Sequence, residues 1–77
     1  MSNEVSIARA FVDSSCIASL GYCMKTGTLE IEFRSGILYR YYRVPTDMYR
    51  ALLGAESKGS FLNRFVKNRY PFKRMNS

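Results

Sequence analysis

The segment Gly36-Ile37-Leu38-Tyr39-Arg40-Tyr41-Tyr42-Arg43-Val44-Pro45 separates two parts of the chain that have different patterns. Its aromatic and apolar residues are typical of a β-strand, and its proline suits the first turn of a helix. Segments with strand patterns precede it, and segments with helical spacing follow it. The sequence therefore predicts an α+β fold, in which a small antiparallel sheet of three to four strands, arranged as a meander, is followed by two C-terminal α-helices packed on one face.

The segment itself predicts two opposite faces, because side chains alternate along a strand. One face has Ile37, Tyr39 and Tyr41, and the other has Leu38, Arg40, Tyr42 and Val44. The aromatic side chains supply surface for a core, and they also offer flat faces for stacking.

Three earlier segments are predicted strands, namely residues 7–12, 17–24 and 28–34. A hairpin turn at Lys25-Thr26-Gly27 connects the second to the third, because Gly27 can adopt the positive φ that such a turn requires. The third alternates most regularly. Its apolar face has Leu29, Ile31 and Phe33, and its polar face, with Glu30 and Glu32, is expected to be exposed to solvent.

Two helices are predicted after residue 45. The first begins after Pro45, ends at Gly54, and has an apolar face of Met48, Tyr49, Leu52 and Leu53. The second begins with Ser60 as its N-cap, and its apolar face consists of Phe61, Leu62, Phe65 and Val66.

Length and composition predict one domain. The chain has 77 residues, of which 47% are hydrophobic, as expected for a folded domain with a single core. The ordered core is expected to span residues 7–72, with Tyr70-Pro71-Phe72 extended and with residues 1–6 and 73–77 flexible.

The positive charge is concentrated at the C-terminal end. The net charge is +6, yet residues 1–56 contain equal numbers of basic and acidic side chains. Residues 57–77 contain no acid, and their basic residues are Lys58, Arg64, Lys67, Arg69, Lys73 and Arg74. Aromatic residues are interleaved with these charges. A basic segment of this kind favours binding to phosphates, although a solvated face that maintains solubility is an equally good explanation of the charges.

The residue types argue against an enzyme. The chain contains no histidine, the commonest general base and metal ligand in proteins. Cys16 and Cys23 have no neighbouring ligands for zinc, so neither a metal nor a cofactor is predicted. The absence of a signal peptide and of a long apolar stretch predicts a soluble cytoplasmic protein with reduced thiols and no membrane contact.

The chain resembles the KTSC domain family over nearly all residues beyond position 13. The resemblance is carried by Ser14-Ser15, Ile17-Ala18-Ser19-Leu20-Gly21-Tyr22, Leu29-Glu30-Ile31-Glu32-Phe33-Arg34-Ser35-Gly36, Tyr39-Arg40-Tyr41 with Val44-Pro45, the helix around residues 49–53, Gly59 with Phe61-Leu62-Asn63, and Tyr70-Pro71-Phe72. The family is named for the C-terminus of certain lysyl-tRNA synthetases and also occurs as stand-alone bacterial or phage proteins. The resemblance implies a stand-alone member of this family, and the synthetase context suggests RNA binding.

The candidate nucleic-acid-binding residues are Arg40, Arg43, Arg64, Lys67, Arg69, Lys73, Arg74, Tyr39, Tyr41, Tyr42 and Tyr70. The arginines and lysines would contact phosphates, and the tyrosines would stack on unpaired bases. Each group has a structural alternative. Arg40 or Arg43 would pair with Glu30 or Glu32 across the strands, and the tyrosines would be buried in the core.

Two functions remain open on the sequence alone. In the first, a non-enzymatic module binds RNA, either tRNA-like or single-stranded, through the basic C-terminal segment and exposed tyrosines. In the second, a bacterial or phage accessory module binds a protein partner through a sheet edge or an aromatic patch. The residues make no prediction of oligomeric state.

Overall fold

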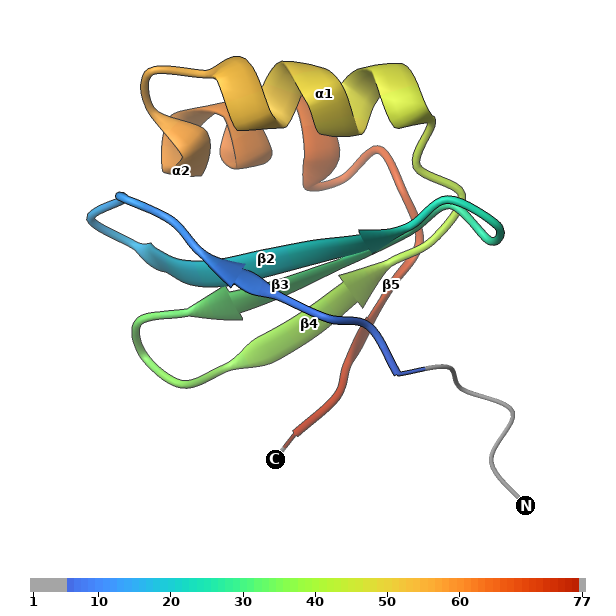
Figure 1. Ribbon diagram of the computed structural model, residues 1–77, viewed down its shortest axis with the longest axis horizontal. Coiled ribbons are helices and arrows are strands. Elements are labelled where there is room, and N and C mark those ends of the chain that lie inside the picture. The colour runs from blue at the N-terminus through green and yellow to red at the C-terminus, as the bar shows by residue number, and fades with distance from the viewer. Residues whose placement is uncertain (1–5, 77) are drawn as a thin grey trace.

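The computed structural model, which describes residues 6–76, has a five-stranded antiparallel sheet with a helical layer on one face (Figure 1). The strands are β1 (Ala10–Phe11), β2 (Ile17–Cys23), β3 (Thr28–Phe33), β4 (Leu38–Tyr41) and β5 (Phe72–Arg74), and they lie in the sheet in that order. The helices are α1 (Thr46–Gly54), α2 (Lys58–Phe61) and the π-helical turn η1 (Leu62–Val66). The predicted α+β fold is confirmed, with one strand more than expected.

The core fills the space between the sheet and the helices. Its buried apolar residues are Ile17, Leu20, Leu29, Ile31, Tyr41, Val44, Leu52, Leu62 and Val66. Full burial of a large apolar side chain contributes about 1.5–3 kcal/mol. Because Leu29 and Ile31 both belong to this core, the alternation in β3 predicted its core face correctly at these two residues.

The hairpin between β2 and β3 has the predicted turn. Gly27 has a φ of 69°, in the left-handed region, and its N–H donates to the Cys23 carbonyl at 2.8 Å. The Gly27 carbonyl in turn accepts from the Val44 N–H at 2.8 Å, so the hairpin also holds the segment that leaves β4.

Val44 lies in the core, whereas the sequence placed it on the face with Leu38 and Arg40. The reason is a single backbone reversal at Arg43, whose φ is 58°. Simple alternation ends at that residue, and Val44 turns inward to become almost fully buried.

The helices differ from the predictions in two details. Leu53 is an exposed residue, so the apolar face of α1 is narrower than predicted. The second helix begins at Lys58 rather than after Ser60, because Ser57 is the N-cap and its hydroxyl oxygen accepts from the Ser60 N–H at 3.3 Å.

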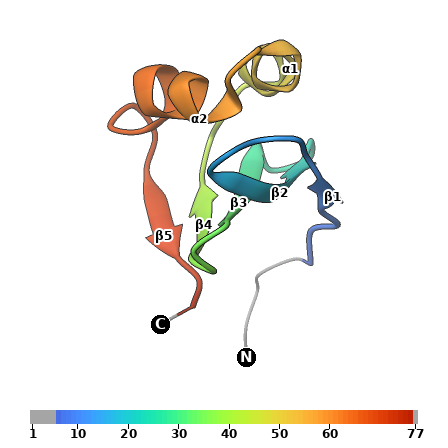
Figure 2. The same cartoon turned by 90° about the vertical axis from the view of Figure 1, so that its left-hand side faces the viewer.

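The fifth strand was not predicted. Residues 72–74 pair with β4 and form an edge of the sheet, as Figure 2 shows. The Tyr42 N–H donates to the Pro71 carbonyl at 2.8 Å, and the Met75 N–H donates to the Leu38 carbonyl at 2.7 Å. The first strand is shorter than the predicted segment 7–12. Flexibility was predicted for residues 1–6 and 73–77; residues 73 and 74 instead belong to β5, while residues 1–5 and 77 lie outside the described residues.

Candidate nucleic-acid interface

An aromatic groove lies between the sheet and the helical layer, from β5 past β4 to the turn between β3 and β4. One part is a hollow of about 120 Å³ lined by Tyr39, Tyr41, Lys67, Asn68 and Phe72. The other is a more open hollow of about 440 Å³ lined by Ser15, Cys16, Phe33, Arg34, Ser35, Ile37, Tyr39 and Lys67. Because Tyr39 and Lys67 line both hollows, the two are adjacent, and together they are called the aromatic groove below.

Tyr39 is the central aromatic residue of the groove. Its ring meets Phe33 at 5.9 Å between centroids and Phe72 at 5.6 Å, with interplanar angles of 83° and 79°. These edge-to-face contacts are the favoured geometry of aromatic pairs. They fix three rings in place, and one of them, Phe72, is 59% exposed.

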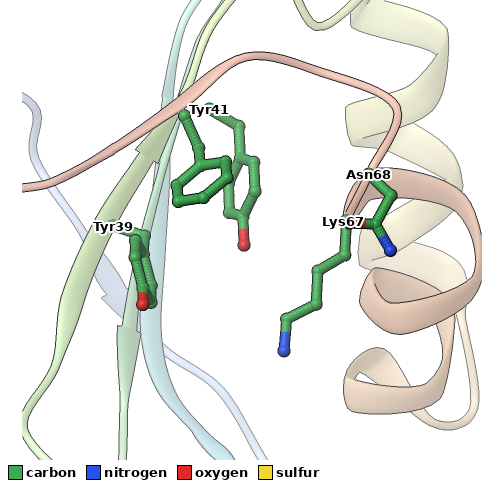
Figure 3. Close-up of a pocket in the computed structure, with 5 residues that line it drawn as sticks. Tyr39, Tyr41, Lys67 and Asn68 are labelled. Carbon is green, nitrogen blue, oxygen red and sulfur yellow. The ribbon is translucent and has the colours of Figure 1, made fainter.

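Lys67 crosses the groove from the helical layer. Figure 3 shows its side chain extending toward the sheet, opposite Tyr39 and Tyr41. Its Nζ lies 5.7 Å from the centroid of the Phe33 ring, within the range of a cation–π contact. The Lys67 N–H donates to the Leu62 carbonyl at 2.9 Å, the five-residue spacing of a π-helix, a feature frequently found at functional sites.

The turn after Lys67 leads the chain into β5. Asn68 has a φ of 68°, a conformation that asparagine adopts more readily than most residues. The chain reverses there, so Lys67 and Phe72 line the same hollow.

The groove has positive charge. Lys67 and Arg34 are its charged lining residues, and no Asp or Glu belongs to the lining within the described part of the chain. The Arg34 Nε donates to the Ser14 carbonyl at 2.6 Å, which orients the guanidinium at the open hollow. Aromatic surface and two cations therefore occur together without a neutralising carboxylate in the lining.

Tyr41 lies deep in the groove and cannot serve as a stacking platform. Only 2% of the residue is exposed. Burial, with a smaller contribution from Tyr39, raises the pKa of its hydroxyl to about 12. We therefore assign Tyr41 to the floor of the hollow rather than to the contact surface.

Arg40 is a buried residue on the helix-free face of the sheet. It pairs in register with Glu30 of β3, and its Nε donates to Glu30 Oε1 at 2.7 Å. Arg9, from the segment before β1, pairs with the other oxygen of Glu30. Glu30, which the sequence placed on a solvated face, is consequently 3% exposed. The cross-strand pairing of Arg40 with Glu30, one of the sequence alternatives, is confirmed, and Arg40 leaves the candidate interface.

The basic C-terminal residues do not form a single stripe. Arg64, Arg69, Lys73 and Arg74 are exposed, as is Arg43 beyond the end of β4. The register of β5 places Arg74 beside Tyr39, on the helical side, and Lys73 beside Arg40, on the helix-free side. Tyr42 and Tyr70 are half-buried. Of the sequence candidates, Tyr39, Tyr41 and Lys67 line the groove, and Arg74 lies next to it.

The groove contains residues that the sequence did not indicate as functional. Phe33 was assigned to the core, and neither Arg34 nor Phe72 was a candidate. Phe72 joins the groove only because β5 pairs with β4, with Phe72 opposite Tyr41. The aromatic residues interleaved with the basic C-terminal segment were the one available signal for Phe72.

Across residues 6–76, no three His, Cys, Asp or Glu side chains are grouped closely enough to hold a metal ion. In the same range, none of the helices has the length and apolar character needed to span a bilayer. Cys16 and Cys23 are free thiols.

Comparison with known proteins identifies the family. The family model of the KTSC domain matches residues 13–70. An uncharacterised protein of Stutzerimonas stutzeri is 46% identical over 59 residues, which cover 77% of this chain and 83% of that protein. A lysine–tRNA ligase of Nostoc punctiforme is 40% identical over 63 residues, 82% of this chain but only 11% of the ligase.

A solved structure agrees with this assignment. The crystal structure of a KTSC domain protein from Yersinia pestis superposes with a TM-score of 0.88 and 32% sequence identity, over 92% of this chain and all of the other. The resemblance recognised from the sequence motifs is thus confirmed by both sequence and fold. The chain belongs to the KTSC domain family.

Proposed function

We propose that this domain is a non-enzymatic module that binds single-stranded RNA in the cytoplasm. The observation that carries the proposal is the aromatic groove, in which Phe33, Tyr39 and Phe72 lie beside Lys67 and Arg34. Exposed aromatic rings stack on unpaired bases of any sequence, with about 1–3 kcal/mol per base. Lysine and arginine neutralise the phosphates that connect those bases.

Charge and kinship support the proposal. The chain has a net charge of +6, which attracts a polyanion from a distance. Its relatives include proteins named lysine–tRNA ligase, a name that refers to an RNA. This domain matches a small part of those proteins. Free thiols at Cys16 and Cys23 are compatible with a reducing compartment.

Binding to RNA is tested by fluorescence anisotropy with labelled single-stranded RNA, tRNA and duplex DNA at several salt concentrations. We expect single-stranded RNA to bind more tightly than duplex DNA, because only unpaired bases can stack in the groove. With Lys67, Arg34 and Arg74 on phosphates, the logarithm of the affinity should fall with a slope of about −2 against the logarithm of the salt concentration.

Matched variants assign the binding to the groove. Lys67→Gln should weaken RNA binding by about fivefold or more, whereas Lys25→Gln removes the same charge outside the groove and should change the affinity by less than about twofold. Flat anisotropy for every nucleic acid at low salt, or equal effects of the two variants, would overturn the proposal.

A protein partner is the second candidate, and one observation favours it. Phe11 on the edge strand β1 is 89% exposed, and an exposed strand edge can pair with a strand of another protein. A role as an accessory module would then depend on β1 rather than on the groove. Phe11→Ser separates the two functions, since it should leave RNA binding unchanged and remove only the binding of a protein partner.

A further inference from the structure

We propose that the aromatic groove is a site for one nucleotide, with the base in the smaller hollow and the phosphate between Lys67 and Arg34. This inference rests on the proposed binding of single-stranded RNA and specifies the unit that the groove holds. It follows from the different sizes and lining residues of the two hollows, from the angles between the aromatic rings, and from the way the two cations are held.

The smaller hollow fits a single flat ring system. Its volume of about 120 Å³ corresponds to the space of about four water molecules. Three aromatic rings line it, and Asn68 adds an amide that can both donate and accept hydrogen bonds at the edge of a base. A hollow of this size is too small for a helix or a strand of a partner protein.

The angle between the rings of Phe72 and Tyr39 suits the smaller hollow to a flat ligand. Phe72 and Tyr39 stand nearly perpendicular to each other, at 79°. A base that stacks on the exposed Phe72 ring therefore presents its edge to Tyr39, and both contacts have favoured aromatic geometry. Tyr41 is also close to Phe72, at 5.9 Å between centroids, and supports that ring from within.

The open hollow is the one that both cations of the groove line, and it would hold the phosphate. It is the larger part of the groove, and Arg34, Ser15 and Ser35 add polar groups to a lining that also contains Phe33, Ile37 and Tyr39. Within residues 6–76, the salt bridges all involve Glu30, with Arg9 or with Arg40, so no carboxylate neutralises Lys67 or Arg34. Lys67 lines both hollows, and its ammonium group lies over the ring of Phe33 at the open one, where the phosphate would bind.

The inference is tested by following backbone amide signals in NMR titrations of the full chain with adenosine monophosphate, adenosine, inorganic phosphate and phenyl phosphate. We expect the monophosphate to shift the signals of Tyr39, Lys67, Asn68 and Phe72, and to bind about fivefold or more tightly than adenosine or phosphate alone. Lys67→Gln should reduce the affinity for the monophosphate to that for adenosine. Phe72→Ala should weaken the binding of both the monophosphate and adenosine, and it should leave the response to inorganic phosphate unchanged.

Control variants and alternative outcomes make the test decisive. Lys25→Gln and Phe11→Ala lie outside the groove and should titrate as the native chain does, and well-dispersed spectra verify that each variant is folded. Equal shifts with phosphate alone would mean a simple anion site, and tighter binding of phenyl phosphate would point to a phosphotyrosine peptide. Either result overturns the inference.

The inference and the proposed function can fail separately. RNA binding that depends on Lys67, without any response of the groove to the monophosphate, would overturn the one-nucleotide site and leave RNA binding in place. A response to the monophosphate without RNA binding would retain the site and overturn the RNA function. If neither RNA nor the monophosphate binds, both the proposed function and the one-nucleotide site are overturned.

Discussion

Glu30 is held by two arginines from different parts of the chain. Arg40 contacts it from the neighbouring strand, and Arg9 contacts it from the N-terminal segment that crosses the helix-free face. Nearby, the Ser19 hydroxyl donates to Glu32 at 2.8 Å and accepts from the Arg9 Nε at 3.0 Å. One buried carboxylate therefore fixes a local segment and a distant one at the same time.

Glu30→Gln should lower the free energy of unfolding by about 3 kcal/mol, because it leaves a buried arginine without its counter-charge. Urea denaturation at neutral pH measures the loss. The matched change Glu32→Gln, on a half-buried residue of the same strand face, should cost less than about 1 kcal/mol. Equal losses for the two variants would contradict a special role of Glu30.

Tyr41 should make stability sensitive to alkaline pH. Its folded-state pKa is raised to about 12 by burial, while the unfolded chain releases this proton near pH 10. Its contribution is fully present below about pH 10 and is lost as the pH rises toward about 12, because only the unfolded state is then deprotonated.

The measurement compares the native chain with Tyr41→Phe. Between about pH 9 and about pH 11, the native chain should lose about 1 kcal/mol more of its free energy of unfolding than the variant, which has no proton to release at this position. The other tyrosines and the lysines titrate in both proteins and cancel in the difference. Parallel curves over this range would show that Tyr41 is not buried in solution.

Among the elements, the segment before β1 depends on a glycine of β2. A side chain at Gly21 would place its Cβ in collision with the Ala8 carbonyl oxygen, so the segment packs directly on the glycine backbone. Gly21→Ala must displace residues 7–9 and should cost about 1–3 kcal/mol. Cleavage by trypsin after Arg9 should become several times faster. The NMR signals of the Lys67 and Phe72 amides, in the aromatic groove, should not shift.

Gly54→Ala is the control for this prediction. No atom lies within 4 Å of the Cβ position at Gly54, and the residue ends α1. This change should be neutral or stabilising by up to about 1 kcal/mol. Unchanged cleavage after Arg9 in Gly21→Ala would contradict the close approach of the N-terminal segment.

The regular elements were predictable because their patterns are repeated over enough residues. Alternation defined β3, and the spacing of Met48, Tyr49 and Leu52 defined α1. The three residues of β5 are all exposed and carry no alternation, so nothing in the sequence distinguished them from a loose end. Val44 was misplaced because one left-handed residue reversed the faces.

The candidate site was predictable in its chemistry but not in its composition. Residue type alone drew attention to Tyr39 and Lys67. Their association with Phe33 and Phe72 depends on the pairing of β5 with β4, a contact between distant parts of the sequence. Arg40 and Tyr41 leave the candidate site because they are buried. Alternation shows which residues share a face of the sheet, but it does not show which face the rest of the chain covers.

For the whole molecule, the parts outside residues 13–70 complete the sheet. The family match leaves out Arg9 with β1 at one edge and β5 at the other. A chain reduced to residues 13–70 should lose at least about 2 kcal/mol, equivalent to a fall in melting temperature of about 10 °C for a domain of this size. Calorimetry measures the fall, and an unchanged melting temperature would show that the two edges are dispensable.

The path of the N-terminal segment also decides how the domain would sit on a longer polypeptide. The chain reaches β1 by crossing the helix-free face, where Arg9 anchors it to Glu30, whereas the aromatic groove opens on the helical side. A tether attached upstream would therefore leave from the back of the domain and keep its front unobstructed. The proposed ligand site would then be equally accessible in a tethered domain and in a free one.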